Sequence, residues 1–204
     1  MSPKALRAFR AGEEARGGGG LYTEQGSGYD KGQERAGCGA PVTHLALLVA
    51  GGAALSLLEG SLPRPLPWMK IGLANVATIL ALYLYGARSA FSVAVLRVLL
   101  GGVFLGFGPG FVLSAGGGIA AWGVMALVKE TLGGTFSVVG VSIWGALTHN
   151  LTQLVLAHLL VRTAAVWALL PAFLWAAGVT GTITGLAADF GLKLLRRYPR
   201  RVLR

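Results

Sequence analysis

The sequence has few charged residues, and this shortage excludes an ordinary soluble domain. Only 13% of the 204 residues are charged, whereas 54% are hydrophobic. Soluble domains carry about 25% charged residues. Glycine contributes 32 residues, which suits transmembrane helices that pack closely at small side chains. We therefore expect an all-α integral membrane protein with its helices in one bundle.

Several chemical signatures are also missing. Cys38 is the only cysteine, which excludes an internal disulfide and leaves no Cys-x-x-Cys or Cys/His pattern for a metal. A Walker A loop needs Gly-Lys-Ser/Thr at its end, and the chain has none. We therefore predict helix packing for the glycine run Gly116–Gly118, and no ATP hydrolysis by this chain. No motif implies a cofactor.

Basic residues outnumber acidic ones and give a net charge of +10. They gather at the two ends of the chain and not on a surface interleaved with aromatic residues, so we expect no nucleic-acid partner. Membrane orientation explains them better, because cytoplasmic segments are enriched in Lys and Arg.

Apolar runs of membrane-spanning length, about 20 residues each, begin at Val42 and are separated by short turns. We expect six spans, at residues 42–62, 71–86, 90–106, 109–128, 136–161 and 164–186. Residues 1–41 read as a disordered tail, because a glycine-rich segment of mixed charge buries too little apolar surface. The transmembrane domain then covers residues 42–190, and residues 191–204 form a basic tail. Fourteen of the 18 Lys and Arg residues fall on one side of this arrangement, so both termini are expected to be cytoplasmic.

Three polar side chains interrupt the fifth apolar run. On a helix with about 100° per residue, His149, Asn150 and Gln153 face one side. An unsatisfied polar group in hydrocarbon costs several kcal/mol, so this face needs a partner. We interpret it as one wall of a substrate cavity, although a buried histidine can also be a satisfied structural group.

Other polar groups lie in neighbouring spans. Asn75 is one turn inside the short second span, and short spans point toward substrate sites. Arg97 lies near the middle of the third span, where an arginine is costly and is by default a functional hypothesis. Its counterpart is either Glu59 or an anionic substrate group, and a structural Arg97–Glu59 pair or snorkelling of Arg97 is the alternative. We assign Glu59, Asn75 and Arg97 to the same substrate-binding site.

Small and hydroxylated residues mark helix faces. Ala46, Ala50 and Ala54 recur every four residues, which indicates a strip for close helix approach, either for docking a partner or for packing inside the bundle. In the sixth span we expect Thr180, Thr182 and Thr184 to bond to their own backbone carbonyls, Gly181 and Gly185 to pack closely, and Asp189 to pair with Lys193. Between the first two spans, the connector with Pro63, Pro65 and Pro67 should be extended, with Trp68 and Lys70 at the interface.

The order of these features resembles a known family. The segments SLLEG (56–60), MKIGLANVATILALYLYG (69–86), LRVLLGG (96–102) and GVSIWGALTHNLTQL (140–154) resemble the bacterial heptaprenyl diphosphate synthase component I family, also called the Gx transporter family. That family looks related to the six-helix S components of energy-coupling factor transporters. The resemblance implies a substrate in the outer half of the bundle and docking through the alanines at positions 46, 50 and 54.

The enzymatic part of that label does not fit the residues. Prenyl chain elongation needs clustered aspartates to hold Mg²⁺, and this chain has only Asp30 and Asp189. We therefore expect a non-enzymatic protein in a bacterial plasma membrane. One hypothesis is a subunit that binds a small, anionic molecule for uptake, with an energy-coupling membrane subunit and ATPases as partners. The alternative is a non-catalytic membrane scaffold for a soluble prenyl synthase.

Overall fold

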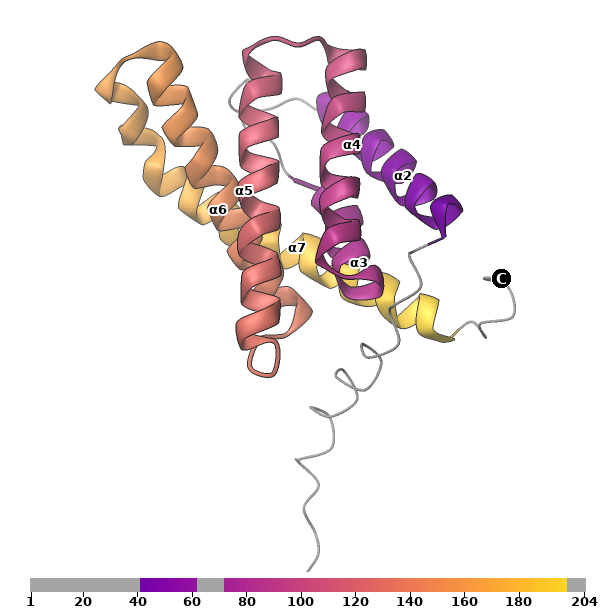
Figure 1. Cartoon of the computed structure of the whole chain (residues 1–204). Helices are drawn as coiled ribbons and strands as arrows, with labels where there is room; N and C mark the ends of the chain where they lie inside the picture. The colour runs from indigo at the N-terminus through magenta and orange to yellow at the C-terminus, as the bar shows by residue number, and fades with distance from the viewer. Residues whose placement is uncertain (1–40, 62–71, 198–204) are drawn as a thin grey trace, which may run out of the picture. The chain divides into compact units, whose positions relative to one another are not determined.

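The described part of this computed structural model comprises residues 41–61 and 72–197. These residues are helical and contain no strand (Figure 1). The elements are α2 (Val42–Ser61), α3 (Asn75–Tyr85), α4 (Ala87–Leu105), α5 (Pro109–Leu132), α6 (Val138–Val161), the 3-10 helix η1 (Ala164–Leu169) and α7 (Leu170–Arg197). The predicted all-α class is confirmed for these residues. The predicted tails, the proline-rich connector, Trp68, Lys70 and Cys38 lie outside them.

Short connections end each helix where the sequence supplies a suitable residue. Gly86 joins α3 to α4 with φ at 88°, and Gly106 ends α4 with φ at 90°, a region that favours glycine. Pro109 occupies the first turn of α5, where its missing N–H costs nothing. Ser137 caps α6 by accepting a hydrogen bond from Gly140 N. Such tight turns bring each helix back beside the one before it.

Contacts between neighbouring helices show that consecutive helices run antiparallel. Asn75 near the start of α3 meets Arg97 in the second half of α4 through a hydrogen bond. In the α6–α7 pair, a Cβ added at Gly181 would lie 2.7 Å from Ile143 Cα, and one at Gly185 would lie 2.7 Å from Val139 Cα. The predicted close-packing face of Gly181 and Gly185 is therefore confirmed.

Four elements among the described residues are long and apolar enough to cross a membrane: Val42–Glu59, Ala87–Leu105, Pro109–Leu132 and the combined Ala164–Arg197. The expectation of six spans is therefore confirmed only in part. Helix α3 has 11 residues and is about 16 Å long at 1.5 Å per residue, about half of a hydrocarbon core of roughly 30 Å. Helix α6 has 24 residues, but its polar side chains lower its hydropathy.

The last helix differs from the expected sixth span. Residues 164–169 form η1, and α7 continues to Arg197, past residue 186, where the expected sixth span ends. Leu, Lys and Arg favour helix, and the predicted Asp189–Lys193 ion pair, 2.7 Å long, holds the last turns. The hydroxyls of Thr180, Thr182 and Thr184 donate to backbone carbonyls four residues earlier, which confirms that prediction.

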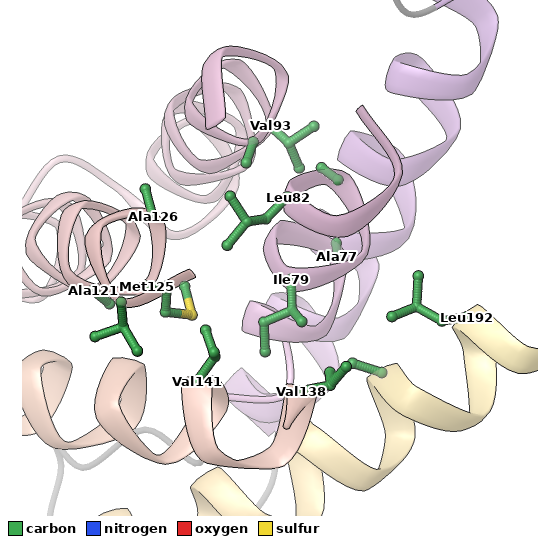
Figure 2. Close-up of a cluster of buried hydrophobic side chains, with 14 of the residues drawn as sticks. Ala77, Ile79, Leu82, Val93, Ala121, Met125, Ala126, Val138, Val141 and Leu192 are labelled. Atoms are coloured by element: carbon green, nitrogen blue, oxygen red, sulfur yellow. The ribbon is translucent and has the colours of Figure 1, made fainter. Parts of the chain in front are cut away.

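Two apolar clusters make up the core. The larger one joins all the α-helices, from α2 to α7, around Ile79 and Leu82 (Figure 2). Met125 of α5 and Val141 of α6 point into it beside these two residues, and all four are 1% exposed or less. The smaller cluster surrounds Phe173 and joins α5, α6, η1 and α7. Neither cluster includes the polar residues that lie between α2, α3, α4, α5 and α6.

Candidate functional site

A cavity of about 240 Å³ lies at the end of the helices where α2 ends, α3 begins, and α4 turns into α5. Its lining includes four residues that the sequence assigns to substrate binding, namely Glu59, Asn75, Arg97 and His149. They come from α2, α3, α4 and α6. The remaining described wall is built from Ser56, Gly72, Ala74, Val98, Gly101, Gly102, Leu105, Gly106, Gly108, Gly110, Phe111 and Ser114.

Arg97 lies against glycines of two other helices. A Cβ at Gly52 of α2 would lie 3.4 Å from Arg97 Cδ, and a Cβ at Gly118 of α5 would lie 3.6 Å from Nη2. Nη2 donates a hydrogen bond of 2.6 Å to Asn75 Oδ1. Nε is buried and donates to no group in residues 41–61 or 72–197. Among the described residues, the guanidinium thus uses one of its five N–H donors in the bond to Asn75.

Glu59 is held by backbone amides. It is 4% exposed, and its Oε1 accepts a hydrogen bond from Leu73 N. The amides of Gly72 and Ala74 also act on the carboxylate. These groups precede α3, where free N–H groups and the helix dipole favour negative charge. Arg97 directs Nη2 to Asn75 and not to Glu59, so the simple Arg97–Glu59 pair that the sequence allowed does not form.

His149 lines the cavity from α6 and lies against α5. A Cβ at Gly117 would lie 2.9 Å from His149 Nδ1 and 3.1 Å from its backbone oxygen. Gly117 therefore makes room for His149, whereas a Cβ at Gly118 would make only ordinary contact with Arg97.

Asn150 and Gln153 lie outside this cavity lining. Asn150 Nδ2 donates a hydrogen bond of 3.0 Å to Phe173 O of α7, so the helix directs it away from His149. Gln153 is 1% exposed, and its amide has no hydrogen-bond partner among residues 41–61 and 72–197. Of the predicted polar face of α6, His149 therefore lines the cavity, Asn150 bonds to α7, and Gln153 is buried one helical turn from His149 without lining the cavity.

The alanine strip of α2 lies on the surface. Ala46, Ala50 and Ala54 are all exposed, while Val49 and Ala53 on another face of the same helix are buried. The strip therefore does not pack inside the described part of the chain. Its role as a docking face stays a prediction.

Sequence reasoning missed part of the wall. Ser56 and Ser114 line the cavity, but each hydroxyl also donates to the carbonyl four residues earlier, as many helical serines do. Three glycines of the α4–α5 turn, Gly106, Gly108 and Gly110, line it as well. The available signal in the sequence is a charge-free cluster of glycines between two apolar spans.

Metal chemistry has no support among the described residues, where no group of three or more His, Cys, Asp or Glu side chains comes together. The cavity instead combines a cation, a carboxylate, an amide and an imidazole with small apolar groups. Such a mixture is typical of a binding site, in which a few polar groups fix the orientation of a ligand.

Comparison with known proteins identifies the family. The sequence model of the family described as heptaprenyl diphosphate synthase component I matches residues 48–191, which is more than half of the chain. The chain belongs to this family. Component I of heptaprenyl diphosphate synthase is a non-catalytic subunit, in agreement with the prediction that this chain is not itself an enzyme. No curated protein and no solved structure matches the chain.

Proposed function

We propose that this protein is a membrane subunit that binds a small molecule with an acidic group for uptake, similar to the S components of energy-coupling factor transporters. The observation that carries the proposal is the cavity in which Arg97, Asn75, Glu59 and His149 meet. An intramembrane arginine with spare donors marks a ligand site by default. At low dielectric it attracts an anionic group more strongly than it would in water.

The position of the cavity supports uptake from outside. It lies where α4 turns into α5, whereas Arg88 and Lys129 lie at the other ends of these two helices. The C-terminal half of α7, with Lys193, Arg196 and Arg197, packs against α3 through Gly191 and Leu80 and belongs to that other end. By the positive-inside rule, this arrangement would have the cavity outside and both termini in the cytoplasm of a bacterial cell.

In this arrangement, six helices are embedded in the plasma membrane. Helix α3 is the short one, and its first residue, Asn75, lines the cavity at membrane depth. Short or interrupted spans place backbone groups and polar side chains beside a substrate without exposing them to lipid.

The partner that supplies energy would dock on α2. Ala46, Ala50 and Ala54 are exposed and present only methyl groups, so the backbone of a partner helix can approach closely. The chain has no Walker A motif, and uptake therefore requires an energy-coupling membrane subunit and ATPases.

A second function is favoured by the family match. In that alternative the chain is a non-catalytic membrane component of a prenyl diphosphate synthase and recruits the soluble catalytic partner. The basic end of α7, with Lys193, Arg196 and Arg197, is suited to an anionic leaflet or an acidic partner, at about 1 kcal/mol for each basic residue near such a surface.

Capture of partners from native membranes separates the two functions. The tagged full chain in detergent should retain an ATPase-containing complex, and Ala50→Trp should abolish the capture because a bulky ring prevents close helix approach. Ala187→Trp, at an exposed alanine of α7, is the matched control and should leave capture intact. Recovery of a prenyl synthase without ATPases would instead support the second function and contradict the first.

A further inference from the structure

The charges of the cavity balance, and this limits the ligands that fit. Glu59 and Arg97 are the charged residues of its described lining, so its formal charge is zero while His149 is neutral. Both side chains are more than nine-tenths buried. The two side chains do not form a direct ion pair. Arg97 instead bonds to Asn75, and Glu59 bonds to the backbone of Leu73. The cavity therefore presents a cation and an anion at separate places on its wall.

Each charged group already has a neutral anchor that fixes its position. Asn75 holds one edge of the Arg97 guanidinium, while Nε makes no hydrogen bond to any residue that the structure describes. Backbone amides before α3 hold the Glu59 carboxylate. Anchored groups lose little freedom when a ligand binds, so both are prepared to meet charges on a ligand.

We propose that the ligand is a small zwitterion whose acidic group meets Arg97 and whose amino group meets Glu59. This inference rests on the proposed binding function and names its substrate class. A ligand with both charges keeps the buried site neutral, whereas a plain acid leaves Glu59 as an uncompensated buried charge. Inorganic or prenyl diphosphate carries at least two negative charges and meets a single arginine, so it fits less well still.

The size of the cavity agrees with a small molecule. A volume of about 240 Å³ lies just below the range of about 300–1,000 Å³ that is typical of small-molecule pockets. A heptaprenyl chain is far larger than this volume. Glycines line much of the wall, so the polar groups at its two sides, and not bulky side chains, would select the ligand.

The inference is tested by binding to the full chain in lipid nanodiscs. The probes are α-, β- and γ-amino acids, betaines and amino sulfonates, each with its matched acid lacking the amino group and its matched amine lacking the acid, together with inorganic diphosphate. Thermal stabilisation identifies binders, and calorimetry measures their Kd. We expect binding by a zwitterion, with its matched acid and amine each at least about tenfold weaker.

The outcomes separate this inference from the proposed function. Tightest binding by a plain acid or by diphosphate, lost in Arg97→Ala, would overturn the zwitterion and leave the binding function intact. Absence of binding by every probe class would overturn both. A zwitterion that binds equally well to Arg97→Ala would also overturn the assignment.

Removal of the carboxylate charge gives a sharper test. Glu59→Gln leaves a net positive cavity, so preference should reverse, with the matched acid binding about tenfold more tightly than the zwitterion. Binding of the acid also shows that the variant is folded. Glu59→Asp, which keeps the charge, should retain preference for the zwitterion, as should Glu130→Gln at an exposed position of α5. An unchanged preference in Glu59→Gln, or a reversal in Glu59→Asp, would contradict the proposal.

Discussion

The packed core and the polar cavity are built from the same helices and differ in their side chains. Helix α3 contributes Asn75 to the cavity and Ile79 and Leu82 to the core, while α4 contributes Arg97 and Val93. The core ends of these helices carry large aliphatic groups that are 1% exposed or less. The cavity ends carry polar groups that need partners. The comparison indicates that α3 and α4 use one end for apolar packing, while the other end carries the polar groups of the proposed binding site.

Helix α5 shows how this division is encoded. Its buried face reads Leu113, Gly117, Ala121 and Met125 at intervals of four residues, so the two smallest residues of this face lie between two larger ones. Helix α6 complements it, with His149 opposite Gly117 and Gly145 opposite Met125. Large residues thus face small ones, as close packing requires.

The largest effect is expected when both cavity charges are removed. Arg97→Met with Glu59→Gln should weaken ligand binding about 100-fold, because charge-assisted contacts to the ligand are lost. The unfolding temperature should stay the same or rise, since apolar replacement of buried charges is often neutral or stabilising. Calorimetry and thermal unfolding in detergent measure the two quantities. If the double variant were less stable but bound the ligand normally, the two charges would serve stability and not binding.

The opposite pattern is expected in the core. Leu82→Ala should lower the free energy of unfolding by about 2 kcal/mol, because surrounding atoms lose packing contacts even where lipid replaces water as solvent. Ligand affinity should change less than twofold. Leu159→Ala, at a side chain that is 61% exposed, is the matched control and should leave the free energy of unfolding unchanged. Chemical unfolding in detergent provides the measurement, and equal losses in both variants would argue against a packed core around Leu82.

A smaller effect on binding is expected at the glycine run. Gly117→Ala places a Cβ 3.1 Å from the backbone oxygen of His149, so α6 must shift and carry the imidazole with it. We expect about tenfold weaker binding, equivalent to about 1.4 kcal/mol. Gly123→Ala in the same helix meets nothing within 4 Å and should bind normally. Equal affinity of the two variants would show that Gly117 does not position His149.

The smallest effect concerns Asn150. Asn150→Ala removes the hydrogen bond to Phe173 O and should cost about 1 kcal/mol of stability, with little change in affinity. On one sample, thermal unfolding measures the stability and calorimetry measures the ligand affinity. A loss of binding without a loss of stability would restore the role in the substrate site that the sequence predicted for Asn150.

Helix class and the polar residues of α2, α3 and α4 follow from the sequence, because a charge or an amide in an apolar run needs a buried partner. The rotation of α6 does not follow. Successive residues differ by 100°, so only knowledge of the flanking helices separates His149, beside α5, from Asn150, beside α7. The partners of Glu59 were also hidden, since backbone amides of residues 72–74 leave no mark in the side-chain pattern.

Element ends were predictable where local chemistry decides them. Pro109 begins α5 and Val161 ends α6 at the expected positions. The start of α3 was set too early, because Gly72 adopts a φ of 83° and delays the helix to Asn75. The end of α7 was set too early for another reason. Charge stops an apolar span, but Lys and Arg favour helix and extend it to Arg197.

The most direct test compares the small molecules that copurify with two forms of the protein. The wild type and the Arg97→Met/Glu59→Gln variant are purified in detergent from the same cells, and released molecules are identified by mass spectrometry. The account predicts one small molecule, at about one copy per protein, that is retained by the wild type and lost from the variant. Retention of the same molecule by a folded variant would contradict the claim that this cavity is the binding site.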